Sequence, residues 1–208
     1  MAQLTFIHST MKSGKSLDLL KTDHAYRERG YKTLLFTSEV DTRYLDNGGL
    51  RDPRKGQITT RIGLKAEAWL IEKVDICRLA REESPDCILV DEAQFLAEEM
   101  ILNLAELVDH EGIPVICYGL KNDFKGELFP GSKALLIYAD TLREIETVCE
   151  YCTNKASMNL RLIDGTPVFS GAQILMGDNE YKPVCRKCYQ SMKRHQTEKA
   201  MQLNGDQK

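Results

Sequence analysis

The sequence predicts an α/β protein, a mostly parallel sheet flanked by helices, followed by a small metal-binding domain. Three observations support this prediction. Strand-like apolar runs alternate with helical periodicity along most of the chain. A phosphate-loop motif joins the first strand-like run to the first helical segment, and two Cys-x-x-Cys pairs lie in the last third.

The elements follow in order along the chain. Strands are predicted at 3–8, 33–37, 87–90, 114–118 and 135–138, and helices at 16–29, 71–83 and 98–110. In the last of these helices apolar residues recur on one face, and Gly112 follows as a stop signal. The stretch 39–60 is rich in Asp, Asn, Gly and Pro and has no periodic apolar face, so it is predicted to be a long loop.

Composition is typical of a soluble globular protein: 208 residues with 42% hydrophobic content can bury one substantial core and carry a small module. No apolar run approaches the ~20 residues of a membrane span, and no signal-peptide pattern opens the chain. We therefore expect a cytoplasmic protein without a membrane partner. The net charge of −3, from 28 basic and 31 acidic residues, provides no field that attracts nucleic acid, so a small ligand is favoured.

The phosphate-loop motif at residues 9–16 is the most informative segment. In such a loop the backbone N–H groups and the helix N-terminus surround the phosphates, Lys15 reaches the β and γ oxygens, and the Ser16 hydroxyl binds Mg²⁺. The usual pattern has Gly where this chain has Ser9, so Ser9 takes either an uncommon conformation or a different turn. The alternative interpretation is a Ser/Gly-rich helix cap. The predicted ATP-binding residues here are Ser9, Thr10, Met11, Lys12, Ser13, Gly14, Lys15 and Ser16.

Two carboxylates, Asp91 and Glu92, follow the apolar run 87–90, at the edge of an α/β sheet where ligands bind. Because successive side chains point to opposite faces of a strand, the two have different roles. Asp91 is assigned to Mg²⁺, directly or through water, by analogy with other phosphate-loop enzymes. Glu92 either orients a water in an ATPase or accepts a hydroxyl proton in a kinase. The alternative is an acidic first turn of the helix that begins near Glu98.

Four cysteines form two pairs, Cys149 with Cys152 and Cys185 with Cys188, which is a strong signal for a tetrahedral Zn²⁺ site. All four thiolates close the coordination sphere, so the metal is structural, and residues 153–184 form a long loop clamped at its base. Two redox-active pairs are the alternative, without the strand-to-helix setting that such sites need. The chain has seven cysteines, an odd number that argues against a disulfide framework, and the others are predicted core thiols: Cys77, Cys87 and Cys117.

Composition changes after about residue 148, where the cysteine pairs and several glycines replace the regular alternation. The predicted organisation is an ATP-binding domain at 1–148, a zinc-binding domain with its long loop at 149–190 and a polar C-terminal tail at 191–208. A short helix at 189–208 is expected to fray before Gly205.

These motifs together resemble the type II thymidine kinases, in order over residues 1–190. The likeness rests on the phosphate loop, on residues 91–95, 117–120, 123–124 and 126–129, and on the closing segment 181–188. It is greatest to the proteobacterial branch, whose phosphate loop also lacks the first Gly. The resemblance implies a P-loop (RecA-like) sheet, and a reaction that transfers the ATP γ-phosphoryl group to the 5′-hydroxyl of thymidine, in deoxynucleoside salvage for DNA synthesis.

The resemblance also implies roles for particular residues. Glu92 is implied to be the general base, and Lys15 is implied to be the second catalytic residue. The ATP site gains Asp41 and Arg43, which otherwise are an ordinary loop pair, together with Asp91, Glu92, Ala93 and Gln94. The nucleoside site comprises side chains around the base and main-chain groups of the zinc-clamped loop. This loop is termed a lasso in the family. These residues are Met11, Phe95, Leu120, Phe124, Phe129, Ala172, Gln173, Ile174, Leu175, Met176, Gly177 and Tyr181.

The same resemblance implies one zinc ion per chain, ATP with Mg²⁺ as co-substrate, feedback inhibition by thymidine triphosphate and a homotetramer. Many members have Gly-Gly where this chain has Met176 and Gly177, which puts the path of the loop in question. The rival hypothesis is a zinc-ribbon P-loop ATPase stimulated by nucleic acid, opposed by the single phosphate loop and the slightly acidic charge. A non-enzymatic nucleotide sensor is the third reading, opposed by Glu92.

Overall fold

A computed structural model describes residues 1–39, 52–174 and 180–205, and the chain divides into two compact units. Unit 1 comprises Met1–His8, Gly14–Lys121 and Leu128–Ile145. Unit 2 comprises Ser9–Ser13, Asn122–Glu127 and Glu146–Lys208. None of the helices in the described ranges is long and apolar enough to cross a membrane.

A seven-stranded sheet forms the centre of unit 1, in the order β3-β4-β2-β5-β6-β1-β7. Its strands are β1 Leu4–Ser9, β2 Thr33–Thr37, β3 Lys55–Thr59, β4 Lys65–Leu70, β5 Cys87–Val90, β6 Val115–Leu120 and β7 Thr141–Glu144. The pairs β2–β4, β2–β5, β5–β6 and β1–β7 are parallel, whereas β3 pairs with β4 antiparallel. The mostly parallel sheet predicted from the alternating pattern is therefore confirmed.

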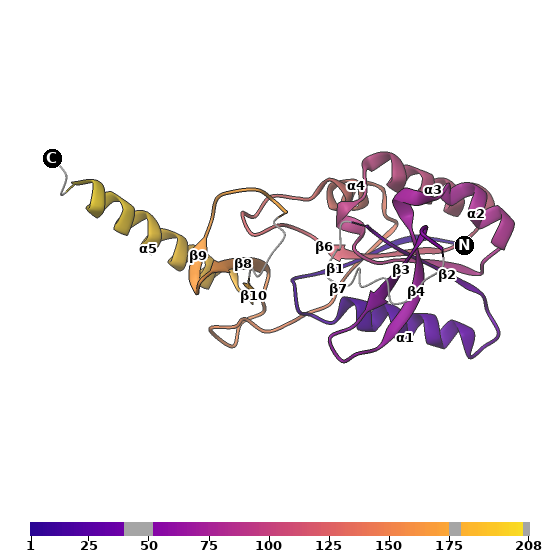
Figure 1. The fold of residues 1–208 in the computed structure, drawn as a ribbon, viewed down its shortest axis with the longest axis horizontal. Helices are drawn as coiled ribbons and strands as arrows, with labels where there is room; N and C mark the ends of the chain where they lie inside the picture. The colour runs from indigo at the N-terminus through magenta and orange to yellow at the C-terminus, as the bar shows by residue number, and fades with distance from the viewer. Residues whose placement is uncertain (40–51, 175–179, 206–208) are drawn as a thin grey trace. The chain divides into compact units, whose positions relative to one another are not determined.

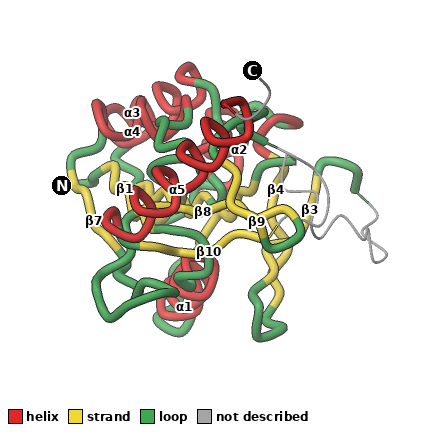
Figure 2. Tube along the Cα trace, turned by 90° about the vertical axis from the view of Figure 1, so that its left-hand side faces the viewer, coloured by secondary structure: helices red, strands yellow, loops and turns green. Residues whose placement is uncertain are grey.

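Helices cover both faces of this sheet, as Figure 1 and Figure 2 show. Helices α2, α3 and α4 lie on one face and α1 lies on the other. Their bounds are α1 Lys15–Arg27, α2 Ile76–Glu83, α3 Glu98–Glu111 and α4 Pro130–Tyr138, with short 3₁₀ turns at η2 Ile71–Lys73 and η3 Ala93–Phe95. Alternate residues of β5 join opposite cores, Ile88 with the α3 side and Leu89 with the α1 side, which explains its continuous apolar run.

One predicted strand is wrong. Residues 135–138 belong to helix α4, and the edge strand is β7, which begins at Thr141. A run of four apolar residues fits a buried strand or a buried helix equally well. Pro130 at the first helical turn and the buried positions Ala134 and Leu135 decide for the helix. The helix predicted at 71–83 is also interrupted, since η2 and α2 are separated by Val74 and Asp75.

The prediction of a long loop at 39–60 is wrong at its C-terminal end, where Lys55–Thr59 form strand β3. This strand turns Gly56 and Ile58 inward. A Cβ atom at Gly56 would lie 2.8 Å from Leu70 Cδ2, so the position has no room for the apolar side chain that would have revealed the strand. Residues 40–51 of this stretch lie outside the described residues.

Unit 2 contains a three-stranded antiparallel sheet in the order β10-β8-β9. Its elements are β8 Met158–Ile163, β9 Thr166–Val168, β10 Glu180–Val184 and α5 Arg186–Gly205. The single long loop predicted at 153–184 is therefore wrong for the parts that form β8, β9 and β10. A two-residue turn with positive φ, Asp164 at 48° and Gly165 at 73°, joins β8 to β9, as a tight hairpin requires. The short helix predicted at 189–208, ending before Gly205, is wrong in its length, because α5 begins at Arg186 and continues to Gly205.

A substitution at Gly131 tests the packing of α4. A Cβ there would lie 2.2 Å from the Ala93 carbonyl oxygen and 2.9 Å from that of Leu96. Gly131→Ala should therefore lower the free energy of unfolding by about 1–3 kcal/mol, although Gly→Ala in an unobstructed helix raises it by up to about 1 kcal/mol. Denaturant melts should show this loss, while the control Lys133→Ala, on the exposed side of α4, changes stability by under ~0.5 kcal/mol. A Gly131→Ala protein as stable as the original would contradict this packing.

Candidate active site

The phosphate loop leaves β1 at Ser9 and enters α1 at Lys15. Positive φ occurs at Lys12 (63°) and at Gly14 (87°), the residue that caps α1, and not at Ser9. Ser9 instead remains in the strand, where its hydroxyl bonds the Thr10 carbonyl oxygen at 3.0 Å and pairs with the Ser13 hydroxyl. The missing glycine therefore imposes no strain at Ser9, because the left-handed positions of this loop lie further along it.

The first turn of α1 brings the predicted lysine and magnesium ligand toward the acidic end of β5. Lys15 is buried, the Ser16 hydroxyl hydrogen-bonds the Asp91 carboxylate, and the charge of Lys15 acts on the same carboxylate. The first N–H groups of a helix have no partner within it and carry partial positive charge. Lys15 and the helix N–H groups favour an anion at this end of the sheet, and the Asp91 carboxylate favours a cation bound to that anion.

Asp91 is only 3% exposed. Burial, and then the neighbouring Glu92 carboxylate, raise the pKa of Asp91 to about 7, against the opposing effects of Ser16 and Lys15. A cation beside Asp91 would favour its ionised form. A buried carboxylate bonded to a hydroxyl is the hard oxygen donor set that Mg²⁺ prefers, so the residues present fit this metal.

Glu92 has a left-handed backbone conformation, φ 52° and ψ 33°, which is uncommon for a residue with a side chain. Its carboxylate is buried, and Gln94 Nε2 donates to Glu92 Oε2 at 2.5 Å. Gln94 is fully buried, and its Oε1 accepts from the Leu120 N–H at 3.0 Å. The predicted base therefore lies at the entry to a tight turn, η3, whose side-chain contacts hold it.

Within unit 1, three of the predicted nucleoside-site residues lie on elements joined to this turn. Phe95 and Phe129 contact edge to face, with ring centroids 5.7 Å apart. The N–H of Leu120, at the end of β6, bonds Gln94, and its carbonyl oxygen accepts from the Ser132 hydroxyl at 2.5 Å. Leu120 and Phe129 are buried, whereas Phe95 is partly exposed. Aromatic rings in this arrangement provide a flat apolar surface.

Unit 2 is organised around Arg161, a residue that the sequence did not predict. Its side chain is fully buried on β8, and the guanidinium lies 3.5 Å from the centre of the Phe124 ring. Its Nε donates to the Tyr181 hydroxyl at 2.8 Å, and its terminal nitrogens donate to the carbonyl oxygens of Ala172 (3.0 Å) and Gln173 (3.1 Å). One buried cation thus brings together four residues predicted for the nucleoside site.

Asn159 lies two residues before Arg161 on β8 and is also buried. Its Oδ1 accepts from the Met11 N–H at 2.8 Å and its Nδ2 donates to the Asn122 carbonyl oxygen at 2.8 Å. These bonds explain why the first half of the phosphate loop belongs to unit 2. Because Asn159 and Arg161 alternate with leucines, the sequence pattern resembles a strand with one polar, solvent-facing side, and this is why both were missed.

The four paired cysteines lie together, with their Sγ atoms all within 4.8 Å of one another. Cys152 Sγ lies 3.6 Å from Cys185 Sγ and 3.7 Å from Cys188 Sγ. Zn–S bonds of about 2.3 Å place the sulfurs of a tetrahedral site about 3.8 Å apart, so this cluster fits Zn²⁺. The Cys188 N–H donates to Cys185 Sγ at 3.4 Å, and this bond, with hydrogen bonds from the neighbouring thiols, lowers the pKa of the Cys185 thiol to about 6. Hydrogen bonding to Cys185 instead raises the pKa of the Cys188 thiol.

The other three cysteines are core residues. Cys87 and Cys117 are fully buried in β5 and β6, and Cys77 packs partly buried against the core that contains Cys117. Burial raises the pKa of the Cys87 thiol to about 11 and raises that of Cys117 further, so both remain protonated thiols.

Some predicted site residues lie outside the described residues: Asp41, Arg43, Leu175, Met176 and Gly177. Of the rest, Ile174 is exposed and Ala93 is buried in η3. The main-chain carbonyls of Ala172 and Gln173 accept from Arg161, and the Gln173 side chain donates to Asp123 Oδ2 at 3.1 Å. The sequence did not predict these internal partners.

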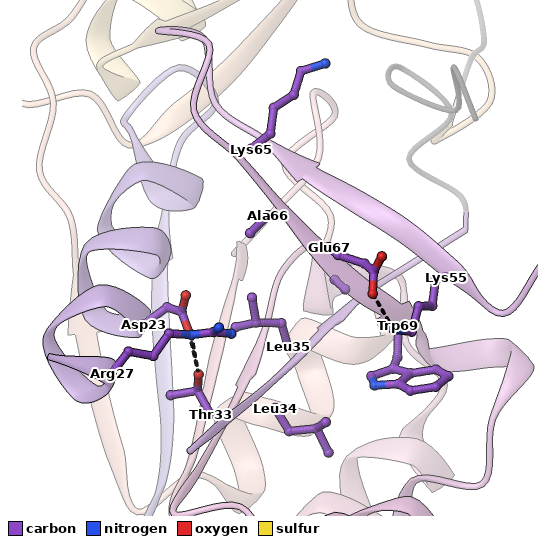
Figure 3. A pocket seen from close by; sticks show the side chains of 11 residues that line it. Asp23, Arg27, Thr33, Leu34, Leu35, Lys55, Lys65, Ala66, Glu67 and Trp69 are labelled. Carbon is purple, nitrogen blue, oxygen red and sulfur yellow. Dashed lines mark hydrogen bonds and ion pairs between the residues drawn. The ribbon is translucent and has the colours of Figure 1, made fainter. Parts of the chain in front are cut away.

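A separate hollow of about 470 Å³ lies on the α1 side of the sheet in unit 1 (Figure 3). None of the predicted site residues lines it. Two ion pairs occupy its wall, Arg27 Nε with Asp23 Oδ1 at 2.8 Å and Lys55 with Glu67. Asp23 also accepts from the Thr33 hydroxyl. The acidic groups of the hollow are therefore neutralised within the protein, and we do not assign the active site to it.

Comparison with known proteins gives consistent results. A family model described as thymidine kinase matches residues 2–189. The thymidine kinase of Lactococcus lactis subsp. lactis is 48% identical over 193 residues, which cover 91% of this chain and 97% of that protein. The thymidine kinase of Listeria monocytogenes serotype 4b is 46% identical over 194 residues, covering 91% and 97%, and that of Streptococcus gordonii is 48% identical over 193 residues, covering 91% and 96%. These relatives are Firmicutes, so they do not support the expected proteobacterial branch.

Among solved structures, a replication initiator DnaA bound to AMPPCP and single-stranded DNA is similar over 70% of this chain and 40% of that chain. The TM-score is 0.43 and the identity 15%, a similarity too low to support an argument.

Arg161 provides a test of the organisation of unit 2. Arg161→Lys keeps the charge but cannot reach the Tyr181 hydroxyl and two carbonyls at once, because an ammonium lacks the planar fork of a guanidinium. Hydrogen exchange in peptides covering residues 169–174 should become at least about tenfold faster, which corresponds to ~1.4 kcal/mol of lost protection. The matched control is Arg186→Lys, an exposed arginine at the start of α5. Equal exchange in the two variants would contradict the organising role of Arg161.

Proposed function

The chain belongs to the thymidine kinase family, and from this premise we propose that it transfers the γ-phosphoryl group of ATP to the 5′-hydroxyl of thymidine through the residues described above. The observation that supports the proposal most directly is the buried pair at the end of β5, Asp91 bonded to Ser16 and Glu92 bonded to Gln94. A metal-binding carboxylate and a separately held second carboxylate are what a phosphate-loop kinase needs at this edge of the sheet.

Unit 1 carries the phosphoryl-transfer groups in this proposal. The start of α1 and Lys15 bind the β and γ phosphates of ATP, and Ser16 and Asp91 hold Mg²⁺. When bound, the Mg²⁺ ion neutralises charge on the transferring phosphoryl oxygens. Lys15 reinforces this effect as a buried cation, because electrostatic stabilisation is strongest where water is excluded.

Glu92 accepts the proton of the thymidine 5′-hydroxyl as that oxygen attacks the γ-phosphorus, and the bond from this phosphorus to the β–γ bridging oxygen breaks, so that ADP leaves with the electron pair. Phosphoryl transfer has a loose transition state in which positioning matters more than the strength of the base. The left-handed backbone of Glu92 and its bond to Gln94 supply such positioning. The sequence left open whether Glu92 orients water or accepts a proton, and family membership favours the second role.

The family resemblance assigns apolar contacts of the nucleoside to Phe95, Leu120 and Phe129. It assigns further contacts to Met11, Phe124 and Tyr181 and to main-chain groups of residues 172–177. Because Arg161 already occupies the carbonyls of Ala172 and Gln173, we assign the polar contacts of the base to the remaining main-chain groups of this loop. Flat aromatic and thioether contacts suit a pyrimidine ring.

The four cysteines hold one structural Zn²⁺ ion. A bound zinc ion joins the two ends of the segment between the cysteine pairs, which contains β8, β9 and β10, and so limits the conformations open to residues 153–184. The small size of the apolar cluster around it, which includes Leu160, Val184 and Tyr189, supports a stabilising rather than a catalytic role for the metal.

Inhibition by thymidine triphosphate and a homotetramer remain proposals from the family resemblance. A cytoplasmic location and the lack of a nucleic-acid partner remain proposals from the composition and the net charge. The nucleic-acid-stimulated ATPase remains the alternative that an assay must exclude.

An assay with γ-labelled ATP tests the function directly. With thymidine present we expect labelled thymidine monophosphate, and with single-stranded DNA in its place we expect no rise in free phosphate. Phosphate release that depends on DNA, without labelled nucleotide, would favour the ATPase instead.

The base role of Glu92 predicts the effect of Glu92→Gln. This change keeps the shape of the side chain and removes the proton acceptor, so turnover should fall ~10²-fold or more, the scale of general acid–base assistance. Affinities for ATP and thymidine, measured by titration calorimetry, should change little. Turnover within threefold of the original protein would remove Glu92 from this role.

The zinc proposal predicts an asymmetric loss of affinity in Cys185→Ser. A hydroxyl is a poor ligand for zinc, so the two ends of the segment 153–184 are no longer joined by the metal, while the sheet of unit 1 keeps its own core. Thymidine affinity should fall sharply, since the loop must be ordered at each binding event, and ATP affinity should fall less. The control is Cys77→Ser, a cysteine outside the cluster, with metal analysis of both proteins. Intact thymidine affinity in a zinc-free Cys185→Ser protein would show that the nucleoside site does not depend on this loop.

A further inference from the structure

We propose that Gln94 is a positioning residue for the phosphoryl transfer: its side-chain amide holds the carboxylate of Glu92 in place and ties it to the end of β6. The inference rests on the proposed base role of Glu92. It also gives Gln94 a function different from the ATP contact predicted from the sequence.

The amide of Gln94 is bonded at both ends within unit 1. Nε2 donates to Glu92 Oε2 at 2.5 Å, and Oε1 accepts from the Leu120 N–H at 3.0 Å. A flipped amide would set Oε1 against a carboxylate and Nε2 against an N–H, so only one orientation satisfies both partners. With Gln94 fully buried, neither bond competes with solvent.

The protein leaves space for this amide. A Cβ atom added at Gly119, next to Leu120 on β6, would lie 2.8 Å from Gln94 Oε1 and 3.1 Å from the Gln94 backbone nitrogen. Gly131 on α4 leaves similar space for the Ala93 carbonyl, one residue earlier. The turn that carries Glu92 and Gln94 is thus held closely between β6 and α4, and its close packing depends on two glycines.

Glu92 needs such support because its backbone is left-handed, a conformation that is unfavourable for a residue other than glycine. Fixing Oε2 through Gln94 also fixes the position of Oε1, the second oxygen of the same planar group. A small misplacement of a reacting group can lower a rate by about 10²-fold. Gln94 therefore acts on turnover through Glu92, and its bond to Leu120 sets the carboxylate relative to a residue of the nucleoside site.

The test is a double-mutant cycle between Gln94→Met and Glu92→Gln, with kcat and KM measured for ATP and thymidine. Methionine nearly preserves the volume and loses both hydrogen bonds. In the original protein Gln94→Met should lower kcat at least tenfold and leave the KM for ATP within threefold. In the Glu92→Gln background the same change should lower kcat less than twofold, because the group that Gln94 positions is already lost.

A second variant, Gln94→Glu, separates positioning from simple structural support. It keeps an acceptor for the Leu120 N–H but replaces the donor to Glu92 with a like charge, so kcat should fall at least as far as in Gln94→Met. The matched control is Gln57→Met on edge strand β3, which should leave kcat unchanged. Thermal melts of every variant identify losses of activity that come from unfolding.

Three outcomes would overturn the inference. Equal fold losses from Gln94→Met in both backgrounds, with Glu92→Gln itself slow, would assign Gln94 to general stability while leaving the proposed base intact. If Gln94→Met raises only the KM for ATP, Gln94 contacts ATP, as predicted from the sequence, and does not position Glu92. Fast turnover in Glu92→Gln alone would overturn the proposed base and the inference together.

Discussion

The burial of two adjacent carboxylates at the end of β5 is the constraint on which the candidate site depends. Asp91 and Glu92 cannot both be held as anions in a dry environment without specific partners. Each has a different set: Asp91 receives the Ser16 hydroxyl and the charge of Lys15, whereas Glu92 receives the amide of Gln94. The parallel sheet makes this arrangement possible, because it delivers the carboxyl ends of β2, β5 and β6 to one edge.

Unit 2 has only a small apolar cluster, so polar contacts contribute more to its organisation. Two buried polar side chains on one side of β8 take over much of the organisation: Asn159 bonds Met11 and Asn122, and Arg161 bonds Tyr181 and the carbonyls of Ala172 and Gln173. The cysteine cluster of the same unit, whose two pairs precede β8 and follow β10, fits a zinc ion. The stability of unit 2 thus depends on directional contacts and less on hydrophobic area, which makes it sensitive to single substitutions.

Much of the fold was predictable because its signals are local. The apolar runs of β1, β2, β5 and β6 and the amphipathic period of α3 are read directly from consecutive residues. The failures occur where local pattern is ambiguous or absent. Residues 135–138 fit a strand or a helix, and β3 carries Gly56 where Leu70 leaves no room for a side chain. The sequence predicted a tight phosphate loop with either an uncommon conformation or a different turn at Ser9. The structure places the positive φ angles of this loop at Lys12 and Gly14.

The sequence by itself determined the family, the phosphate loop, the acidic end of β5 and the two cysteine pairs, because each of these depends on residue type and short spacing. Only the tertiary structure decided how those groups are held. Arg161 and Asn159 appear in the sequence as polar positions of a strand, and Gln94 as one residue of a motif. Their partners lie up to 148 residues away along the chain. Such contacts form only when the strands and turns have folded together, so no local pattern in the sequence encodes them.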